Sequence, residues 1–203
     1  MNILIRVTVC LAALIPFAEM IYIAVTEQMG SNSGGFILAY SGSWALNFLA
    51  LSLAISPAIR ITGLKILGSL QTMMGLLIFL YASLHVLAWI ALDLNWKWQL
   101  IIERATQSPV LLPGFAAFLL LIPLLTNSSS AIQNGFSSIS GLIGKLIIPV
   151  VVLSMIHFFL ITSSDRTMPG IYAAVFLTLM GYRGKAGLIP RSIPDLISRI
   201  LRK

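Results

Sequence analysis

Long apolar runs are the feature that most limits what this chain can fold into. Six of them are long enough, or nearly so, to cross a hydrocarbon layer of about 30 Å as a helix rising about 1.5 Å per residue. They lie at residues 3–25, 42–59, 67–92, 110–126, 142–163 and 168–183. In lipid, backbone polar groups must be bonded within the segment, so such runs fold as helices. The sequence therefore predicts an all-α integral membrane protein, a bundle of six transmembrane helices.

The composition leads to the same class. Of 203 residues, 58% are apolar and only 9% are charged, whereas a soluble domain is about one quarter charged. The connections between runs are short and rich in turn formers, as in Gly30–Gly35 and Asn127–Ser130, and leave no room for a soluble catalytic domain. No internal repeat is visible. We expect one membrane domain over residues 1–183, with the first run retained as a helix, and a basic cytoplasmic tail over residues 184–203.

The distribution of basic residues predicts the orientation. If the N-terminus is inside, the outer segments contain only Lys97, Arg104 and Arg166 of the 13 Lys and Arg residues, and the inner segments contain the remaining ten. Cytoplasmic loops carry such an excess, so both termini should be cytoplasmic. The basic tail then faces anionic lipid head groups, and no nucleic-acid partner is expected.

Several kinds of chemistry are excluded by the residues available. Cys10 is the only cysteine, so the chain has no intramolecular disulfide and no set of thiolates for an iron–sulfur cluster. Two histidines and six acidic residues spread over six runs provide no Ser-His-Asp arrangement, phosphate loop or hydrolase metal motif. The chain is therefore not expected to act as a self-sufficient enzyme.

The two histidines, His85 and His157, each lie inside a long apolar run. An imidazole in hydrocarbon usually faces a partner, a water-filled cavity or a cofactor. Both helices run outward, and both histidines lie about 9 to 10 Å before the outer boundary. At equal depth on neighbouring helices, two neutral imidazoles can occupy the two axial positions of one haem iron. The alternative, that each histidine is an ordinary hydrogen-bonding residue between helices, stays open.

Other residues in the runs have simpler expected roles. Glu19 is expected to be structural, with proton transfer or pairing with a bound group as the alternatives, and Asn47 is expected to bond across helices. The segment Asn95–Trp98 is expected to anchor the chain at the outer head groups. Apolar neighbours of the histidines either cover a macrocycle or contact lipid and core; these are Leu84, Leu87, Trp89, Met155 and Phe158.

Several motifs with fixed spacing occur between residues 40 and 160. They are Ser41-Gly-Ser-Trp-Ala-Leu-Asn-Phe-Leu49, Ile55-Ser-Pro57 with Arg60, Gly75-Leu76, Phe79, Tyr81-Ala-Ser-Leu-His85, Leu92-Asp93 and Asn127-Ser-Ser-Ser-Ala-Ile-Gln133. In these the chain resembles the ferric-reductase-like transmembrane superfamily, and more closely the haem-binding membrane subunits of periplasmic methionine-sulfoxide reductase systems. The resemblance implies a bacterial inner-membrane protein in which His85 and His157 are the axial ligands of a b-type haem that passes electrons outward to a periplasmic partner.

The departures from that pattern lie at the cytoplasmic end. Gly144 stands where the family has a further histidine, Gln71 and Thr72 where it has a basic pair, and Ser140 where it has a tryptophan. We therefore expect one outer haem and no inner one. A single outer haem is too far from a cytoplasmic flavin, so the expected donor is a membrane quinol or a neighbouring redox subunit.

Two functions from different classes follow. The first is a b-type cytochrome subunit with one haem in the outer leaflet. The alternative is a degenerate, haem-free structural or assembly subunit of a larger respiratory or photosynthetic membrane complex. A solute transporter has little support, because no pair of broken helices in repeated halves is visible.

Overall fold

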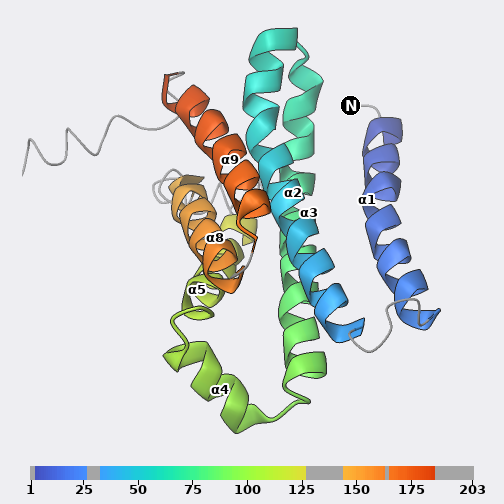
Figure 1. Ribbon diagram of the computed structural model, residues 1–203. Helices are drawn as coiled ribbons and strands as arrows, with labels where there is room; N and C mark the ends of the chain where they lie inside the picture. Colours follow the sequence, from blue (N-terminus) through green and yellow to red (C-terminus); the bar gives the residue numbers. More distant parts are fainter. Residues whose placement is uncertain (1–2, 27–32, 127–143, 163–164, 186–203) are drawn as a thin grey trace, which may run out of the picture.

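The computed structural model describes residues 3–26, 33–126, 144–162 and 165–185, and within these ranges every regular element is a helix (Figure 1). In chain order they are α1 (Ile3–Val25), α2 (Ser33–Thr62), the 3₁₀ turn η2 (Lys65–Leu70), α3 (Gln71–Ala88), the π-helical turn η3 (Trp89–Asp93), α4 (Trp98–Gln107), α5 (Leu112–Thr126), the 3₁₀ turn η4 (Gly144–Leu146), α8 (Ile147–Ile161) and α9 (Thr167–Lys185).

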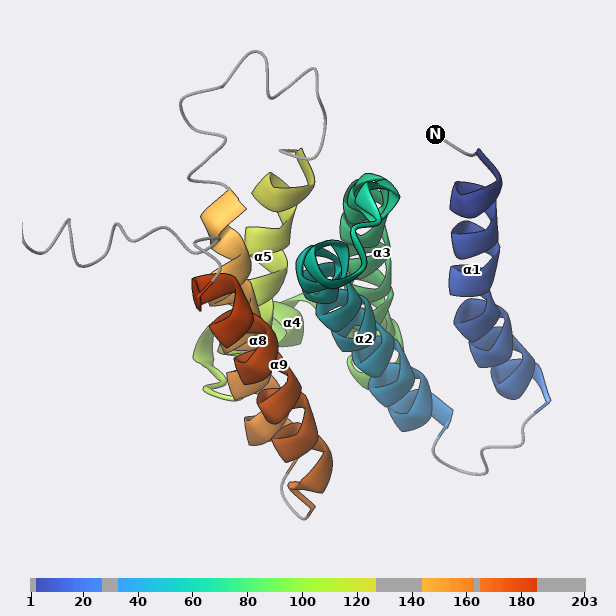
Figure 2. The ribbon, with the colours of Figure 1, turned by 90° about the horizontal axis from the view of Figure 1, so that it is seen from above.

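Two antiparallel helix pairs form the centre of the molecule. Helix α2 pairs with α3, and α5 pairs with α8, while α3 and α5 join the two pairs. Helix α9 packs against α2 and α8, and α1 lies on the other side of the α2/α3 pair (Figures 1 and 2). The long helices alternate in direction, so the start of α1 and the end of α9 lie at the end of the molecule where α2 leads into α3 (Figure 1).

Three of the described helical stretches are long and apolar enough to cross a membrane: Ile3–Val25, Gly34–Thr62 and Lys65–Asp93. A fourth candidate is the pair Trp98–Gln107 and Leu112–Leu125, whose two parts meet at 97°. Helix α8 is apolar but has only 15 residues. The described part of the chain is thus all helical, and the protein is a transmembrane protein. The part of the predicted run 142–163 before residue 144, and the basic tail after residue 185, lie outside the described residues.

Helix α2 is longer than predicted. The sequence placed a crossing at residues 42–59 and a turn at Gly30–Gly35, but α2 begins at Ser33 and contains 30 residues. The glycines at its start are helical because a neighbouring helix is close. A Cβ on Gly34 would lie 3.3 Å from the Cβ of Leu92. Glycine here permits close packing, which overrides its weak helix propensity.

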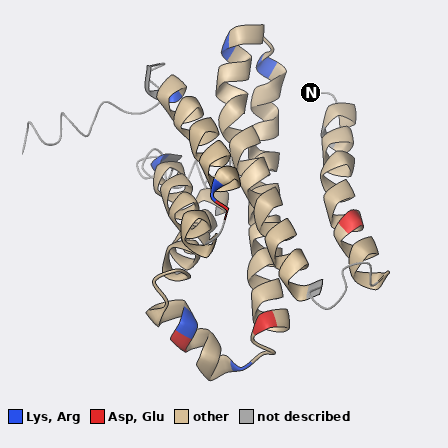
Figure 3. Ribbon diagram, viewed as in Figure 1, with Lys and Arg blue, Asp and Glu red and all other residues tan. Residues whose placement is uncertain are grey.

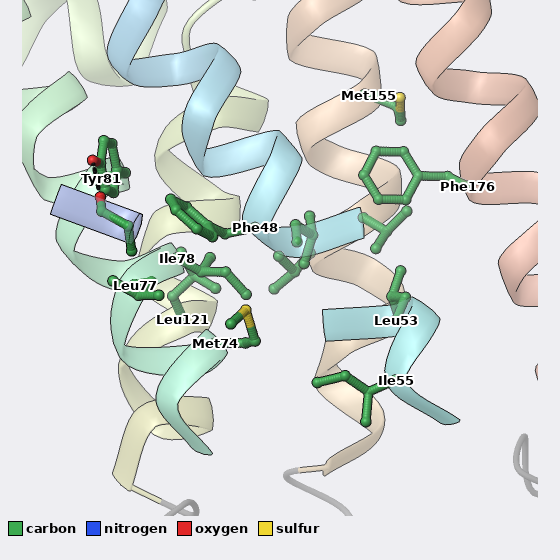
Figure 4. Packing of buried hydrophobic residues seen from close by; sticks show 14 residues of the cluster. Phe48, Leu53, Ile55, Met74, Leu77, Ile78, Tyr81, Leu121, Met155 and Phe176 are labelled. Atoms are coloured by element: carbon green, nitrogen blue, oxygen red, sulfur yellow. Dashed lines mark hydrogen bonds between the residues drawn. The ribbon is translucent and has the colours of Figure 1, made fainter. Parts of the chain in front are cut away.

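The core lies where the two pairs and α9 meet. Phe48 and Tyr81 have ring centres 5.1 Å apart, and Met155 lies near Phe176 (Figure 4). The Tyr81 hydroxyl donates a 2.7 Å hydrogen bond to the Ala13 carbonyl oxygen and so ties α3 to α1.

A second polar contact joins two helices within the apolar region. The Tyr172 hydroxyl of α9 donates a 2.6 Å hydrogen bond to Oδ1 of Asn47 in α2. The prediction that Asn47 bonds across helices is therefore confirmed.

Charged residues of the described helices lie mainly at the ends of the bundle (Figure 3). Arg60 and Lys65 mark the end where α2 leads into α3. The opposite end is formed by η3, which contains Asp93, and by α4, which follows Lys97 and contains Glu103 and Arg104; Trp96 and Trp98 are exposed there. The middle of the bundle presents exposed apolar side chains to its surroundings, as expected for a chain that lies in lipid.

Candidate functional site

A cavity of about 530 Å³ lies between the α2/α3 pair and the α5/α8 pair. All four helices line it, and its size is within the range of about 300 to 1,000 Å³ that is typical of small-molecule and cofactor sites. No Asp, Glu, Lys or Arg is among its lining residues, and the side-chain polar groups there come from Ser43, Trp89, Ser154, Thr162 and the two histidines. It is therefore suited to a largely apolar ligand.

His85 of α3 and His157 of α8 face each other across this cavity. Their ring centres are 6.2 Å apart and their ring planes meet at 81°. The sequence placed the two imidazoles at equal depth on helices that run in the same direction, and the structure brings them together. The two rings therefore do not lie on faces of α3 and α8 that point away from each other.

The orientation of each ring is set by a backbone carbonyl. Nδ1 of His85 lies 2.8 Å from the Leu38 carbonyl oxygen, and Nδ1 of His157 lies 2.8 Å from the Val110 carbonyl oxygen. A carbonyl oxygen only accepts, so each Nδ1 must carry the proton and donate it. In the neutral imidazole, Nε2 then keeps its lone pair and is the nitrogen that can bind a metal.

A glycine lies behind each ring. A Cβ on Gly42 would lie 2.9 Å from Nδ1 of His85, and a Cβ on Gly114 would lie 2.9 Å from Nδ1 of His157. Real side chains do not approach this closely, so each ring touches the backbone of the neighbouring helix.

The two halves of the site repeat each other with a constant offset. The carbonyls, glycines and histidines are each 72 residues apart, since 110 − 38, 114 − 42 and 157 − 85 all equal 72. The same offset relates further lining residues: Ala45 and Ala117, Leu49 and Leu121, Ile78 and Val150, Ala82 and Ser154. The two helix pairs therefore contribute matching positions to the wall of the cavity. The sequence analysis found no internal repeat, and the correspondence between these pairs is seen only where the structure brings them to one cavity.

The remaining predicted residues are divided between the cavity and its surroundings. Trp89 and Phe158 line the cavity, whereas Met155 is buried in the core, Leu84 packs against that core and Leu87 is exposed. Glu19 lies outside the cavity and accepts a hydrogen bond from the Tyr40 hydroxyl, which agrees with a structural role.

At the other end of the bundle, Gln71 and Thr72 begin α3, and Gly144 begins η4. Ser140 lies outside the described residues. Among the residues described, no group of three or more His, Cys, Asp or Glu side chains is placed to hold a metal ion.

Sequence reasoning missed the two glycines and the two carbonyls. The constant offset of 72 between the two glycine-histidine pairs is present in the sequence, but only the structure shows which of the glycines touch a ring.

Comparison with known proteins agrees with this architecture. Residues 41–155, which include His85 and end two residues before His157, match the family described as ferric reductase like transmembrane component. No solved structure matches the chain.

Among curated proteins, several similar relatives are named protein-methionine-sulfoxide reductase heme-binding subunit MsrQ. The one from Xanthomonas oryzae pv. oryzae is 34% identical over 178 residues, covering 85% of this chain and 82% of the relative. The one from Xanthomonas euvesicatoria pv. vesicatoria is 35% identical over 158 residues, covering 78% and 72%. The one from Ralstonia nicotianae is 31% identical over 182 residues, covering 88% and 84%. The chain therefore belongs to the ferric reductase like transmembrane family and is similar to its MsrQ heme-binding subunits.

Proposed function

We propose that this chain is a membrane electron-transfer subunit in which Nε2 of His85 and Nε2 of His157 hold one b-type haem in the outer leaflet. Electrons pass between a quinol or membrane redox partner and a partner on the periplasmic side. The observation that carries the proposal is the separation and orientation of the two imidazoles.

The separation fits two ligands on one iron. A metal ion bonds an imidazole nitrogen at about 2.0 Å and lies about 3.1 Å from the ring centre, so two axial imidazoles have centres about 6.3 Å apart. The rings of His85 and His157 have centres 6.2 Å apart. Their tautomers leave both Nε2 atoms able to bind, and the apolar lining suits a macrocycle.

The residues of the chain have three tasks at such a site. When bound, the haem iron takes up and releases one electron as it changes between its ferric and ferrous states. The histidines supply neutral ligands, and the Leu38 and Val110 carbonyls fix their tautomers and ring orientation. The apolar helices keep water and competing ligands from the iron.

A single haem follows from the ligand count. The chain has only two histidines, and its inner end has Gln71, Thr72 and Gly144 at the positions that differ from the family pattern. This arrangement favours a donor that reaches the outer leaflet from within the membrane, such as a quinol, over a cytoplasmic flavin.

The proposal includes six crossings of a bacterial inner membrane with both termini in the cytoplasm. The alternating direction of the long helices supports an even number of crossings (Figure 1). In this proposal the short helix α8 and the bent pair α4/α5 each count as one crossing, and both pack against the other helices of the bundle. The names of the relatives mark them as subunits of a reductase, so we propose a redox partner for this chain as well.

Removing either ligand tests the proposal. We expect the purified protein to show a low-spin haem spectrum that is lost in His85→Ala and in His157→Ala, and retained in Asn47→Ala, which alters an intramembrane polar residue outside the cavity. If both histidine variants keep the parent spectrum, the assignment is wrong. If the parent binds no haem, the cytochrome proposal is wrong, and the alternative of a haem-free structural subunit takes its place.

A further inference from the structure

We infer that Gly42 and Gly114 are a symmetric pair of positioning residues that set the place and angle of the two imidazoles. The inference rests on the proposed haem site and extends it to two residues that make no contact with the iron. At each of these positions, any side chain larger than that of glycine would overlap the histidine ring.

The local geometry shows how each glycine acts. In α2, the carbonyl of Leu38 accepts from Nδ1 of His85, and Gly42 lies one helical turn later on the same face. In the same way, the carbonyl of Val110, just before α5, accepts from Nδ1 of His157, and Gly114 lies four residues later. Each imidazole ring thus contacts the backbone at the glycine, and its Nδ1–H donates to a carbonyl one helical turn away.

A methyl group at either position would clash with the facing histidine ring. It would lie 2.9 Å from Nδ1 and 3.0 Å from Cε1 of His85, and at Gly114 it would lie 2.9, 3.0 and 3.1 Å from three atoms of the His157 ring. The ring is rigid and is held by its hydrogen bond, so relief requires the ring to move into the cavity and the bond to Leu38 or Val110 to break. Such a shift changes both the ring separation and the 81° angle between the planes.

Other glycines of the helices provide matched controls. Gly181 in α9 has nothing within 4 Å of an added Cβ, so Gly181→Ala tests the effect of helix propensity alone. Gly34 in α2 is packed at 3.3 Å against Leu92, so Gly34→Ala tests crowding between helices away from the rings.

The test compares Gly42→Ala and Gly114→Ala with these controls in the purified, haem-loaded protein. We expect each to reduce haem affinity by about 10- to 100-fold, the usual effect of losing a residue that orients a metal ligand. The ferric haem that remains should show a changed electron paramagnetic resonance spectrum, because that spectrum depends on the angle between the imidazole planes. Gly34→Ala and Gly181→Ala should match the parent. Parent-like affinity and spectra in both Gly42→Ala and Gly114→Ala would overturn the inference.

A second background separates ring displacement from misfolding. In His85→Gly the ring is absent, so adding Gly42→Ala should leave the yield and the gel-filtration profile of His85→Gly unchanged. If the double variant instead fails to fold, Gly42 is needed for helix packing and the inference is wrong.

Nitrogen NMR of the histidine rings in haem-free protein gives a readout that does not depend on haem. We expect the proton to be on Nδ1 in the parent and this preference to be lost at His85 in Gly42→Ala. An unchanged His85 tautomer would contradict the inference even if the parent binds no haem. Absence of haem from a parent with the expected tautomers would overturn only the proposed function.

Discussion

At the scale of single residues, the role of each histidine depends on groups that carry no sequence signal of their own. His85 and His157 could be selected from the sequence because ionisable side chains are rare in apolar runs. Their hydrogen-bond partners could not, because every residue has a backbone carbonyl. Gly42 and Gly114 could not be selected either, since 15 glycines occur in the chain and only the packing shows which of them touch a ring.

The buried Tyr81 hydroxyl provides a test at this scale. It is 1% exposed and bonds the Ala13 carbonyl oxygen, so Tyr81→Phe should lower the free energy of unfolding by about 0.5 to 1.5 kcal/mol. Unfolding in mixed detergent micelles measures this change, with Tyr22→Phe as the control because Tyr22 is exposed on α1. Equal stability of the two variants would contradict the account. The haem spectrum should stay the same in both.

At the scale of helices, the apolar runs predicted where most helices lie but not all of their ends. The ends of α1 coincide with the predicted run 3–25, because its limits are set by polar residues. The start of α2 was missed by nine residues, because Gly34 and Gly35 are typical of turns in isolation and become helical only against Leu92. The bend between α4 and α5 lies at Ser108, whose extended backbone ends α4.

The contact between α2 and α9 gives a prediction for helix pairing. A double-mutant cycle of Asn47→Ala and Tyr172→Phe should give a coupling of about 0.6 kcal/mol, the average for hydrogen bonds between membrane helices. The unfolding free energies of the two single variants and the double variant measure it. Strict additivity of the two single effects would show that the bond does not stabilise the pair.

At the scale of the whole molecule, two similar helix pairs enclose one cavity, and charges lie mainly at the two ends (Figure 3). The histidine pair of the site could be predicted because equal depth and equal helix direction follow from the order of the runs. The correspondence between the α2/α3 pair and the α5/α8 pair could not be predicted, because it is seen only when residues 72 positions apart are found to line the same cavity.

The orientation in the membrane can be tested with single cysteines in a Cys10→Ser background. Lys97→Cys lies at the end with the exposed tryptophans, and Leu64→Cys lies in the exposed connection between α2 and η2. With cytoplasmic termini, a membrane-impermeant maleimide added to spheroplasts should label Lys97→Cys and should label Leu64→Cys only after permeabilisation. The opposite pattern would reverse the topology.

The most direct test of the central claim is the haem content and spin state of the purified parent protein. Two imidazoles with centres 6.2 Å apart and no further histidine predict one haem per chain, low-spin in both oxidation states. Protein from haem-sufficient cells that contains no haem, or two haems per chain, would contradict the account.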